Sequence, residues 1–231
     1  MAEMKKIGIL GGMSLHSTIH YIDGLNREIN KAKGGLASPR IVMSAVDFSE
    51  IEPLQRSGDW SRMAKVLSDE AKYIEMGGAD FVILSTNTMH KVADDITAAI
   101  KIPFIHIADA TRDAILADGI KTIGLLGTRY TMEQEFYKGR LASAGLKVII
   151  PNDSDRKIIN DIIYQELCLG IVKTESEKQY QNIIEKLKAD GAEGVILGCT
   201  EIGMLVKKSS LPLYDTTEIH IRAAAKYAME G

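Results

Sequence analysis

KIGILG, at residues 6–11, is an apolar run that ends in glycine, and it returns as TIGLLG at residues 122–127. A second segment, GADFVIL at residues 78–84, returns as GAEGVIL at residues 191–197. The two offsets, 116 and 113 residues, are nearly equal, so we interpret the chain as two similar halves. Chance matches between short strands of one α/β chain are the alternative. Runs of this kind are typical of strands buried on both faces of a parallel sheet.

Helical periodicity alternates with such runs along the chain. The pattern predicts helices over about 17–33, 60–76, 90–100, 132–144, 155–169, 175–189 and 217–229. It predicts strands over about 7–10, 40–46, 81–84, 103–107, 122–126, 147–150 and 195–197. This alternation indicates an α/β fold with mainly parallel sheets covered on both faces. We therefore expect two similar three-layer lobes, related by a pseudo-two-fold axis with the active site between them: residues 1–102 with 211–231, and residues 103–210.

The composition excludes several classes of function. The chain has 231 residues, is 45% hydrophobic and carries a formal net charge of −3, which argues against binding to nucleic acid. No apolar run is long enough to span a membrane, and residues 1–6 lack the apolar stretch of a signal peptide, which favours the cytoplasm. Neither a C-x-x-C pair nor a histidine pair at helical spacing is present, so we expect no metal site.

Polar residues follow the third predicted strand of each half. They are Ser85-Thr86-Asn87-Thr88 in the first half and Gly198-Cys199-Thr200-Glu201 in the second. The offset of 113 residues makes Thr86 the counterpart of Cys199. Ligands of open α/β sheets bind beyond the carboxyl ends of the strands, and a following helix N-terminus suits a carboxylate. The two segments are therefore predicted to flank one substrate.

Two similar groups on either side of one carbon suit a racemisation, in which one face loses a proton and the other gains one. A thiolate serves as the base, and a nearby helix N-terminus is expected to lower its pKa. A threonine hydroxyl is too weak an acid to be a resting base, so it donates a proton or relays one from water. We expect Cys199 to abstract the proton and Thr86 to assist reprotonation.

Four motifs together resemble the aspartate/glutamate racemase family along the whole chain. They are Gly11-Gly12-Met13-Ser14, residues 85–90 (STNTMH), residues 127–131 (GTRYT) and Gly198-Cys199-Thr200-Glu201. The sequence is most similar to the bacterial L-aspartate/glutamate-specific racemases, in which threonine replaces the first of two cysteines. The resemblance implies an enzyme without a cofactor, a homodimer, and abstraction of the Cα proton of an L-amino acid by Cys199. Together with the strand-end pattern it predicts the residues that bind the substrate: Met13, Ser14, Gln55, Arg56, Asn87, Thr88, Thr131, Thr200 and Glu201. Cys168 stands where aspartate-specific members carry a lysine, and the sequence does not discriminate between aspartate and glutamate.

Simpler roles compete with these assignments. Cys199 is alternatively a buried structural thiol, and Cys168 lies in an apolar helical pattern typical of a core or a pocket wall. Asn87 and Thr88 are expected to cap a helix while also contacting substrate. Arg56 is as plausible a surface charge as a carboxylate ligand, and Glu201 a helix-start acid or a partner of Thr200 or of the substrate ammonium. His90 and His220 are expected to be hydrogen-bonded core residues.

Two other functions fit the same motifs. One is a related thiol enzyme, such as a hydantoin racemase, a maleate isomerase or a malonate decarboxylase. An isomerase of double bonds would use Cys199 as a nucleophile, and maleate would trap it as a covalent adduct. The other is a protein that binds an amino acid without catalysis, in which no solvent deuterium would enter Cα.

Overall fold

The computed structural model describes residues 3–230, which divide into two compact units. The N-terminal unit contains the chain up to Ile107 and the segment from His220 onward. The C-terminal unit contains residues 108–219. Each unit has its own sheet, and each is described separately below.

The two sheets share one strand order. In the N-terminal unit β1 (Ile7–Gly11), β2 (Ile41–Ala45), β3 (Phe81–Leu84) and β4 (Phe104–Ile105) pair in the order β2-β1-β3-β4, all parallel. In the C-terminal unit β5 (Thr122–Gly127), β6 (Lys147–Ile149), β7 (Gly194–Gly198) and β8 (Leu213–Asp215) pair in the order β6-β5-β7-β8, also all parallel. β5 thus takes the place of β1, and β7 that of β3, as the repeats at residues 6–11 and 78–84 require. The predicted α/β class with two parallel sheets is confirmed.

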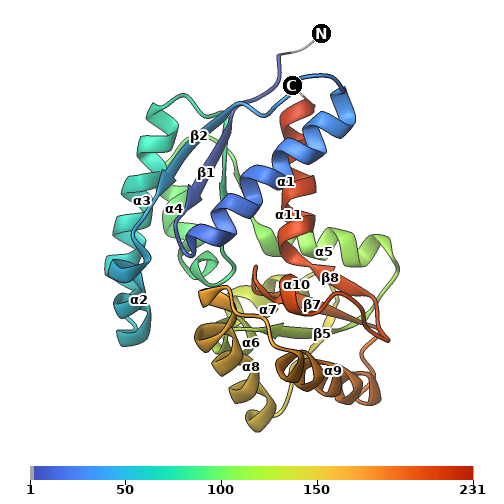
Figure 1. Ribbon diagram of the computed structural model, residues 1–231. Helices are drawn as coiled ribbons and strands as arrows, with labels where there is room; N and C mark the ends of the chain where they lie inside the picture. The colour runs from blue at the N-terminus through green and yellow to red at the C-terminus, as the bar shows by residue number, and fades with distance from the viewer. Residues whose placement is uncertain (1–2, 231) are drawn as a thin grey trace. The chain divides into compact units, whose positions relative to one another are not determined.

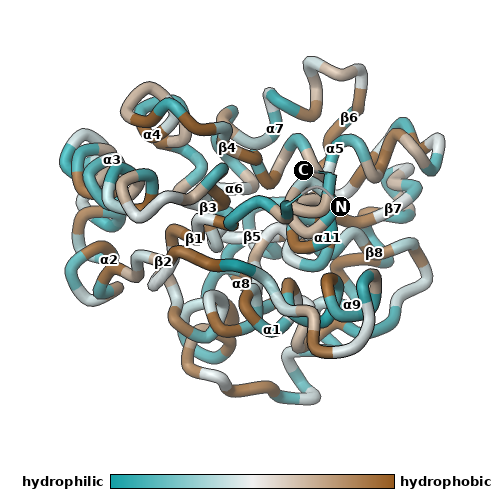
Figure 2. Tube along the Cα trace, turned by 90° about the horizontal axis from the view of Figure 1, so that it is seen from above, coloured by the Kyte–Doolittle hydropathy of each residue, from teal (hydrophilic) through white to brown (hydrophobic). Residues whose placement is uncertain are grey.

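Helices cover both faces of the N-terminal sheet. α1 (Leu15–Lys33) and α11 (Thr216–Met229) pack on the face formed by residues such as Ile9 and Ile83. α3 (Trp60–Met76) and α4 (Ala93–Ala99) pack on the other face, with Leu10 and Leu84. Successive strand residues point to opposite faces, so a fully apolar strand fills both cores. Figure 1 shows α1 and α11 side by side, and β1 is coloured as hydrophobic in Figure 2.

One glycine sets the approach of α1 to α11. A Cβ atom on Gly24 would lie 2.6 Å from Cδ1 of Ile221, which is closer than packed side chains come. Glycine therefore lets the two helices, nearly 200 residues apart in sequence, approach closely. This contact packs α11 against α1 on one face of the first sheet.

The C-terminal unit has a similar organisation. Its helices are α5 (Ile107–Ala117), α6 (Arg129–Glu133), α7 (Glu135–Ala142), α8 (Asp153–Gln165), α9 (Thr174–Ala189) and α10 (Ile202–Leu205), with a 3-10 turn η2 (Leu167–Leu169). α6, α8 and α9 contact β5, one of the two central strands of this sheet. The N-cap of α8 is Asn152, whose side chain accepts a hydrogen bond from Asp155 N at 3.0 Å.

Several predicted elements differ from the structure. The expected helix over 132–144 is two helices, because Gln134 has an extended backbone (φ −98°, ψ 154°) between α6 and α7. The expected helix over 90–100 is the 3-10 turn η1 (Thr88–Val92) followed by α4. α2 (Phe48–Ser57), which contains Pro53, was not predicted, and neither were α5 and β8. None of the helices described is long and apolar enough to cross a membrane.

Candidate functional site

In the N-terminal unit, hydrogen bonds hold together the loops that follow β1 and β3. Ser85 N donates to Leu10 O at 3.0 Å, and Ser17 Oγ donates to Ser85 O at 2.8 Å. Thr18 Oγ1 lies 3.1 Å from Ser85 Oγ and accepts from Gly12 N at 2.9 Å. Two hydroxyls from the first turn of α1 therefore fix both strand ends. The structure thus brings together the loop of Met13 and Ser14 and the loop of Thr86.

The predicted substrate-binding residues of these loops are buried. Met13, Ser14, Asn87 and Thr88 are all almost fully covered, and Thr86 is 8% exposed. Ser14 is the N-cap of α1, where its Oγ accepts from Ser17 N at 3.3 Å. The expected capping by Asn87 is wrong, because Asn87 has a helical backbone (φ −77°, ψ −48°) and its side chain makes no capping hydrogen bond. A side-chain cap requires an extended residue in that position.

His90 fixes the backbone at Thr86. Its Nδ1 lies 2.7 Å from Thr86 O, and its Nε2 accepts a hydrogen bond from Ile107 N at 3.2 Å. A carbonyl only accepts and an amide N–H only donates, so the contacts require a neutral ring with the proton on Nδ1. Its ring centroid lies 4.4 Å from that of His106. His90 is therefore a hydrogen-bonded core residue, as expected, and it links the end of β3 to the start of α5.

His220 is also hydrogen-bonded in the core. Its Nδ1 lies 2.9 Å from Tyr21 Oη, and its Nε2 lies 2.9 Å from Ile105 O. Burial lowers the pKa of this imidazole to about 4, so it is neutral at physiological pH.

α2 carries the two predicted carboxylate ligands. Gln55 is buried, whereas the side chain of Arg56 is 75% exposed. A guanidinium nitrogen of Arg56 lies 3.8 Å from Glu52, one turn earlier on the same helix. The structure therefore places Arg56 at the surface of the unit, and its part in substrate binding stays a prediction.

In the C-terminal unit, two glycines bring the ends of β5 and β7 close together. A Cβ on Gly127 would lie 2.8 Å from Gly198 O, and a Cβ on Gly198 would lie 2.7 Å from Leu126 O. Only glycine fits such a close approach of two backbones. After β5, Thr128 is the N-cap of α6 and its Oγ1 accepts from Thr131 N at 3.4 Å. Thr131, another predicted substrate ligand, is fully buried.

One carboxylate oxygen joins the functional groups that follow β7. Cys199 Sγ donates to Glu201 Oε2 at 3.0 Å, and Thr200 Oγ1 donates to the same oxygen at 2.5 Å. Cys199 is 9% exposed and Glu201 is buried. The carboxylate therefore orients both the thiol and the hydroxyl that the sequence singled out. Its contact with the thiol was not predicted.

The expected lowering of the Cys199 pKa is wrong. Burial raises the pKa of this thiol well above its usual value, and the negative charge of Glu201 raises it further. The following helix, α10, has only four residues, which is too short to offset these effects. The resting thiol is therefore protonated and is a strong base once it loses its proton.

Cys168 lies in η2 and interacts electrostatically with the Glu201 carboxylate. Burial, followed by the charge of Glu201, raises its pKa to about 12. Both thiols also contribute to the raised pKa of the buried Tyr180. Cys168 is thus part of the surroundings of Cys199, in keeping with a pocket wall. In residues 3–230 we find no cluster of three or more histidine, cysteine, aspartate or glutamate side chains that could hold a metal ion.

A family model of the Asp/Glu/hydantoin racemases matches residues 10–224. The chain belongs to this family. The match includes all four of the motifs that follow β1, β3, β5 and β7.

Members of the family with known structures align with nearly the whole chain. A Yersinia pestis protein assigned to the Asp/Glu racemases is 52% identical, with a TM-score of 0.92 over 98% of this chain and 100% of that one. An aspartate racemase homologue from Pyrococcus horikoshii is 36% identical, with a TM-score of 0.85 over the same shares. The broad-specificity amino-acid racemase RacX of Bacillus subtilis is 26% identical over 91% of this chain and 92% of its own.

Proposed function

We propose that this protein racemises acidic amino acids, L-aspartate or L-glutamate, without a cofactor. Cys199 would take the Cα proton from the L enantiomer, and Thr86 would help to return a proton to the other face. The observation that carries the proposal is the equivalence of two strand ends: Cys199 follows β7 and Thr86 follows β3, in units of one topology. Similarity to an aspartate racemase homologue and to a broad-specificity amino-acid racemase supports this activity.

The contact of Cys199 with Glu201 gives the thiol an acceptor for its proton. A raised thiol pKa reduces the resting fraction of thiolate, but it makes that thiolate a stronger base toward the weakly acidic Cα–H bond. In the reaction, the electron pair of the thiolate forms the S–H bond. The electron pair of the Cα–H bond passes to Cα and is delocalised into the substrate carboxylate.

Thr86 has a different part, because its hydroxyl is not ionised at neutral pH. We propose that it donates a proton to the carbanion and is reprotonated by water, or positions a water that donates directly. The hydrogen bond between His90 and Thr86 O fixes the backbone from which this hydroxyl projects. His90 is thus a positioning residue for Thr86.

Hydroxyl and amide groups supply the proposed recognition of the substrate. Ser14, Gln55, Asn87 and Thr88 of the N-terminal unit and Thr131 of the C-terminal unit offer neutral donors that suit carboxylates. Glu201 offers the only charged group among the buried candidates, and a carboxylate suits the substrate ammonium. Thr200 donates to Glu201 and so helps to hold it.

Incorporation of solvent deuterium at Cα tests the proposal. The wild type is incubated in deuterium oxide with each enantiomer of aspartate and glutamate, and the substrate is analysed by proton NMR and chiral chromatography. We expect Cys199→Ser to lose exchange by a factor of about 1,000 or more, because an alcohol is a far weaker acid than a thiol. Cys168→Ser is the matched control and should retain exchange. Full exchange in Cys199→Ser would refute the mechanism.

Three further outcomes test the role of Thr86 and separate the related activities. Thr86→Cys supplies a second thiol, and faster turnover from the D enantiomer would support a role for residue 86 at the other face of Cα. Binding of aspartate without any deuterium at Cα would identify a binding protein instead. A covalent adduct of maleate with Cys199 would indicate nucleophilic isomerisation.

A further inference from the structure

The exposed face of α1 carries two histidines one helical turn apart. They are His16 and His20, and both side chains are exposed. This pair corrects the expectation from the sequence that no two histidines lie at helical spacing. Residues four apart lie on the same face of a helix, with Cβ atoms about 5–6 Å apart. Two imidazoles at this spacing can bind one metal ion, as they do in zinc enzymes whose helix carries His-Glu-x-x-His.

The other three histidines of the chain are not available to a metal ion from solution. The chain has five histidines in all. His90, His106 and His220 are buried, with at most 5% of each exposed. Both exposed histidines of the chain therefore lie on this one turn of α1.

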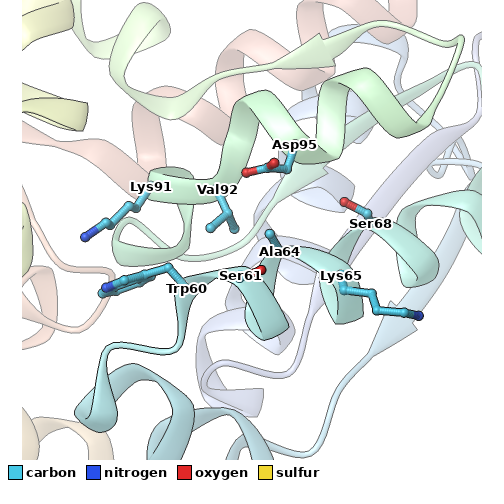
Figure 3. Close-up of a pocket in the computed structure, with 8 residues that line it drawn as sticks. All are labelled: Trp60, Ser61, Ala64, Lys65, Ser68, Lys91, Val92 and Asp95. Atoms are coloured by element: carbon cyan, nitrogen blue, oxygen red, sulfur yellow. The ribbon is translucent and has the colours of Figure 1, made fainter.

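The hollow between α3 and η1 offers a metal ion much less. Figure 3 shows the residues that line it, with Lys91 extended over the ring of Trp60. Among these eight described residues, Asp95 is the only one with a carboxylate, an imidazole or a thiol. The histidine pair of α1 is thus the stronger candidate for a metal site.

The pair provides two protein ligands and leaves the other coordination positions to water. Each imidazole has two ring nitrogens, so one nitrogen can bind the ion while the other keeps a hydrogen bond. Water in the remaining positions makes the ion exchangeable, unlike the ion of a closed structural site. Imidazole suits Cu²⁺, Ni²⁺ and Zn²⁺, and the general order of affinities places Cu²⁺ highest.

The same turn of α1 holds the candidate functional site from its buried side. Ser17 Oγ donates to Ser85 O at 2.8 Å, and Thr18 Oγ1 accepts from Gly12 N at 2.9 Å. Ser17 and Thr18 lie between the two histidines in sequence. An ion that bridges the histidines would hold this turn in its helical form. It would thereby also stabilise the contacts of the turn with the loops that follow β1 and β3.

We propose that His16 and His20 bind one divalent transition-metal ion, which stabilises the first turns of α1. The site uses neither Cys199 nor Thr86. It is separate from the proposed racemisation, so either proposal could fail while the other stands.

Calorimetry with Ni²⁺ tests the site, with untagged protein at a mildly alkaline pH at which imidazole is neutral. We expect one ion to bind per chain, with a dissociation constant on the order of 10–100 μM, which is weaker than at a site with four protein ligands. His16→Gln and His20→Gln should each weaken binding by about 10-fold or more, because the second imidazole of the pair binds at a high effective concentration. Cys199→Ser should bind Ni²⁺ as the wild type does.

The matched control moves one histidine along the helix. The double variant His20→Gln/Asp23→His keeps two histidines but places them seven residues apart, about 10 Å along the helix axis. Asp23 is 76% exposed, so the substitution leaves the core intact. Binding should fall as far as in His20→Gln. Circular dichroism checks that each variant folds.

Thermal unfolding tests the effect of the ion on α1. Saturating Ni²⁺ should raise the unfolding temperature of the wild type, because the folded helix holds both imidazoles in place, and should not raise that of the double variant. The proposal would be overturned by the absence of saturable binding or by equal binding in the double variant. Loss of binding in Cys199→Ser would assign the ion to the thiol instead. An unfolding temperature that does not rise would show that the ion does not stabilise the helix.

Discussion

Replacing Glu201 by glutamine tests the electrostatic account of Cys199 most directly. The substitution keeps the shape of the side chain and removes the negative charge 3.0 Å from the thiol sulfur. At an effective dielectric constant of about 20, two unit charges about 3 Å apart repel by about 5 kcal/mol. Shifts from neighbouring like charges are smaller in proteins, about 1–3 pKa units. We therefore expect the Cys199 pKa to fall by about 1–3 units in Glu201→Gln.

Alkylation by iodoacetamide measures this pKa, because only the thiolate reacts. The assay uses a Cys168→Ser background in both proteins, so that one thiol remains. In Glu201→Gln the alkylation rate should reach its high-pH plateau about 1–3 units lower than in the parent. Mass spectrometry confirms that Cys199 is the modified residue.

The same change should move the pH dependence of exchange. Below the thiol pKa, kcat/KM should rise about tenfold for each unit of pH, since the transition state needs the thiolate. This rise should also level off at lower pH in Glu201→Gln, while KM increases if Glu201 holds the substrate ammonium. An alkylation profile that does not move, or that moves to higher pH, would show that Glu201 does not raise the thiol pKa.

Further substitutions test the surroundings of the site. His90→Phe should lower the free energy of unfolding by about 2–5 kcal/mol, measured with urea, because two buried backbone groups lose their partner. It should also slow deuterium exchange at Cα, and His90→Gln should recover part of both the stability and the exchange. Gly198→Ala should lower the free energy of unfolding by about 1–3 kcal/mol and lower the melting temperature, because its methyl group would lie too close to Leu126 O. His220 has a pKa of about 4 in the folded protein and binds a proton more readily when the chain is unfolded. The free energy of unfolding should therefore fall by about 3 kcal/mol from pH 6.5 to pH 4, and by less in His220→Asn. Progress curves from the two enantiomers of aspartate should coincide at low substrate concentration, and a persistent difference would indicate another reaction.

The strands could be predicted because their signal is local. β1, β3, β5 and β7 are continuous apolar runs, and burial on both faces demands that composition. α2 was missed because Pro53 interrupts a short amphipathic pattern, although its helix is capped by Asp47, which accepts from Ser49 N. The break at Gln134 was missed because one extended residue changes the chain direction without changing the hydrophobic period.

The candidate site was predictable in position but not in electrostatics. The strand-end rule and the internal repeat place Thr86 and Cys199 in sequence, since both rest on topology. The state of the thiol depends instead on how deeply Cys199 is buried and on which side chain accepts its proton. Glu201 lies two residues further along the chain, and no spacing rule indicates that its carboxylate turns back to the sulfur. The contact of His90 with Thr86 O likewise follows from the tight turn of η1.

The difference between a thiol and a hydroxyl cannot make a racemase irreversible. The two enantiomers have equal free energies in water, so the equilibrium constant is one and both directions must share one kcat/KM. Replacing a thiol by Thr86 therefore alters kcat/KM by the same factor in both directions, whereas kcat and KM separately need not change equally. If Thr86 slows proton abstraction from the D enantiomer, then the D enantiomer must also be bound more tightly before reaction. A preference for the L substrate is thus visible only near saturation, and it measures how the protein stabilises two bound states rather than where the reaction ends.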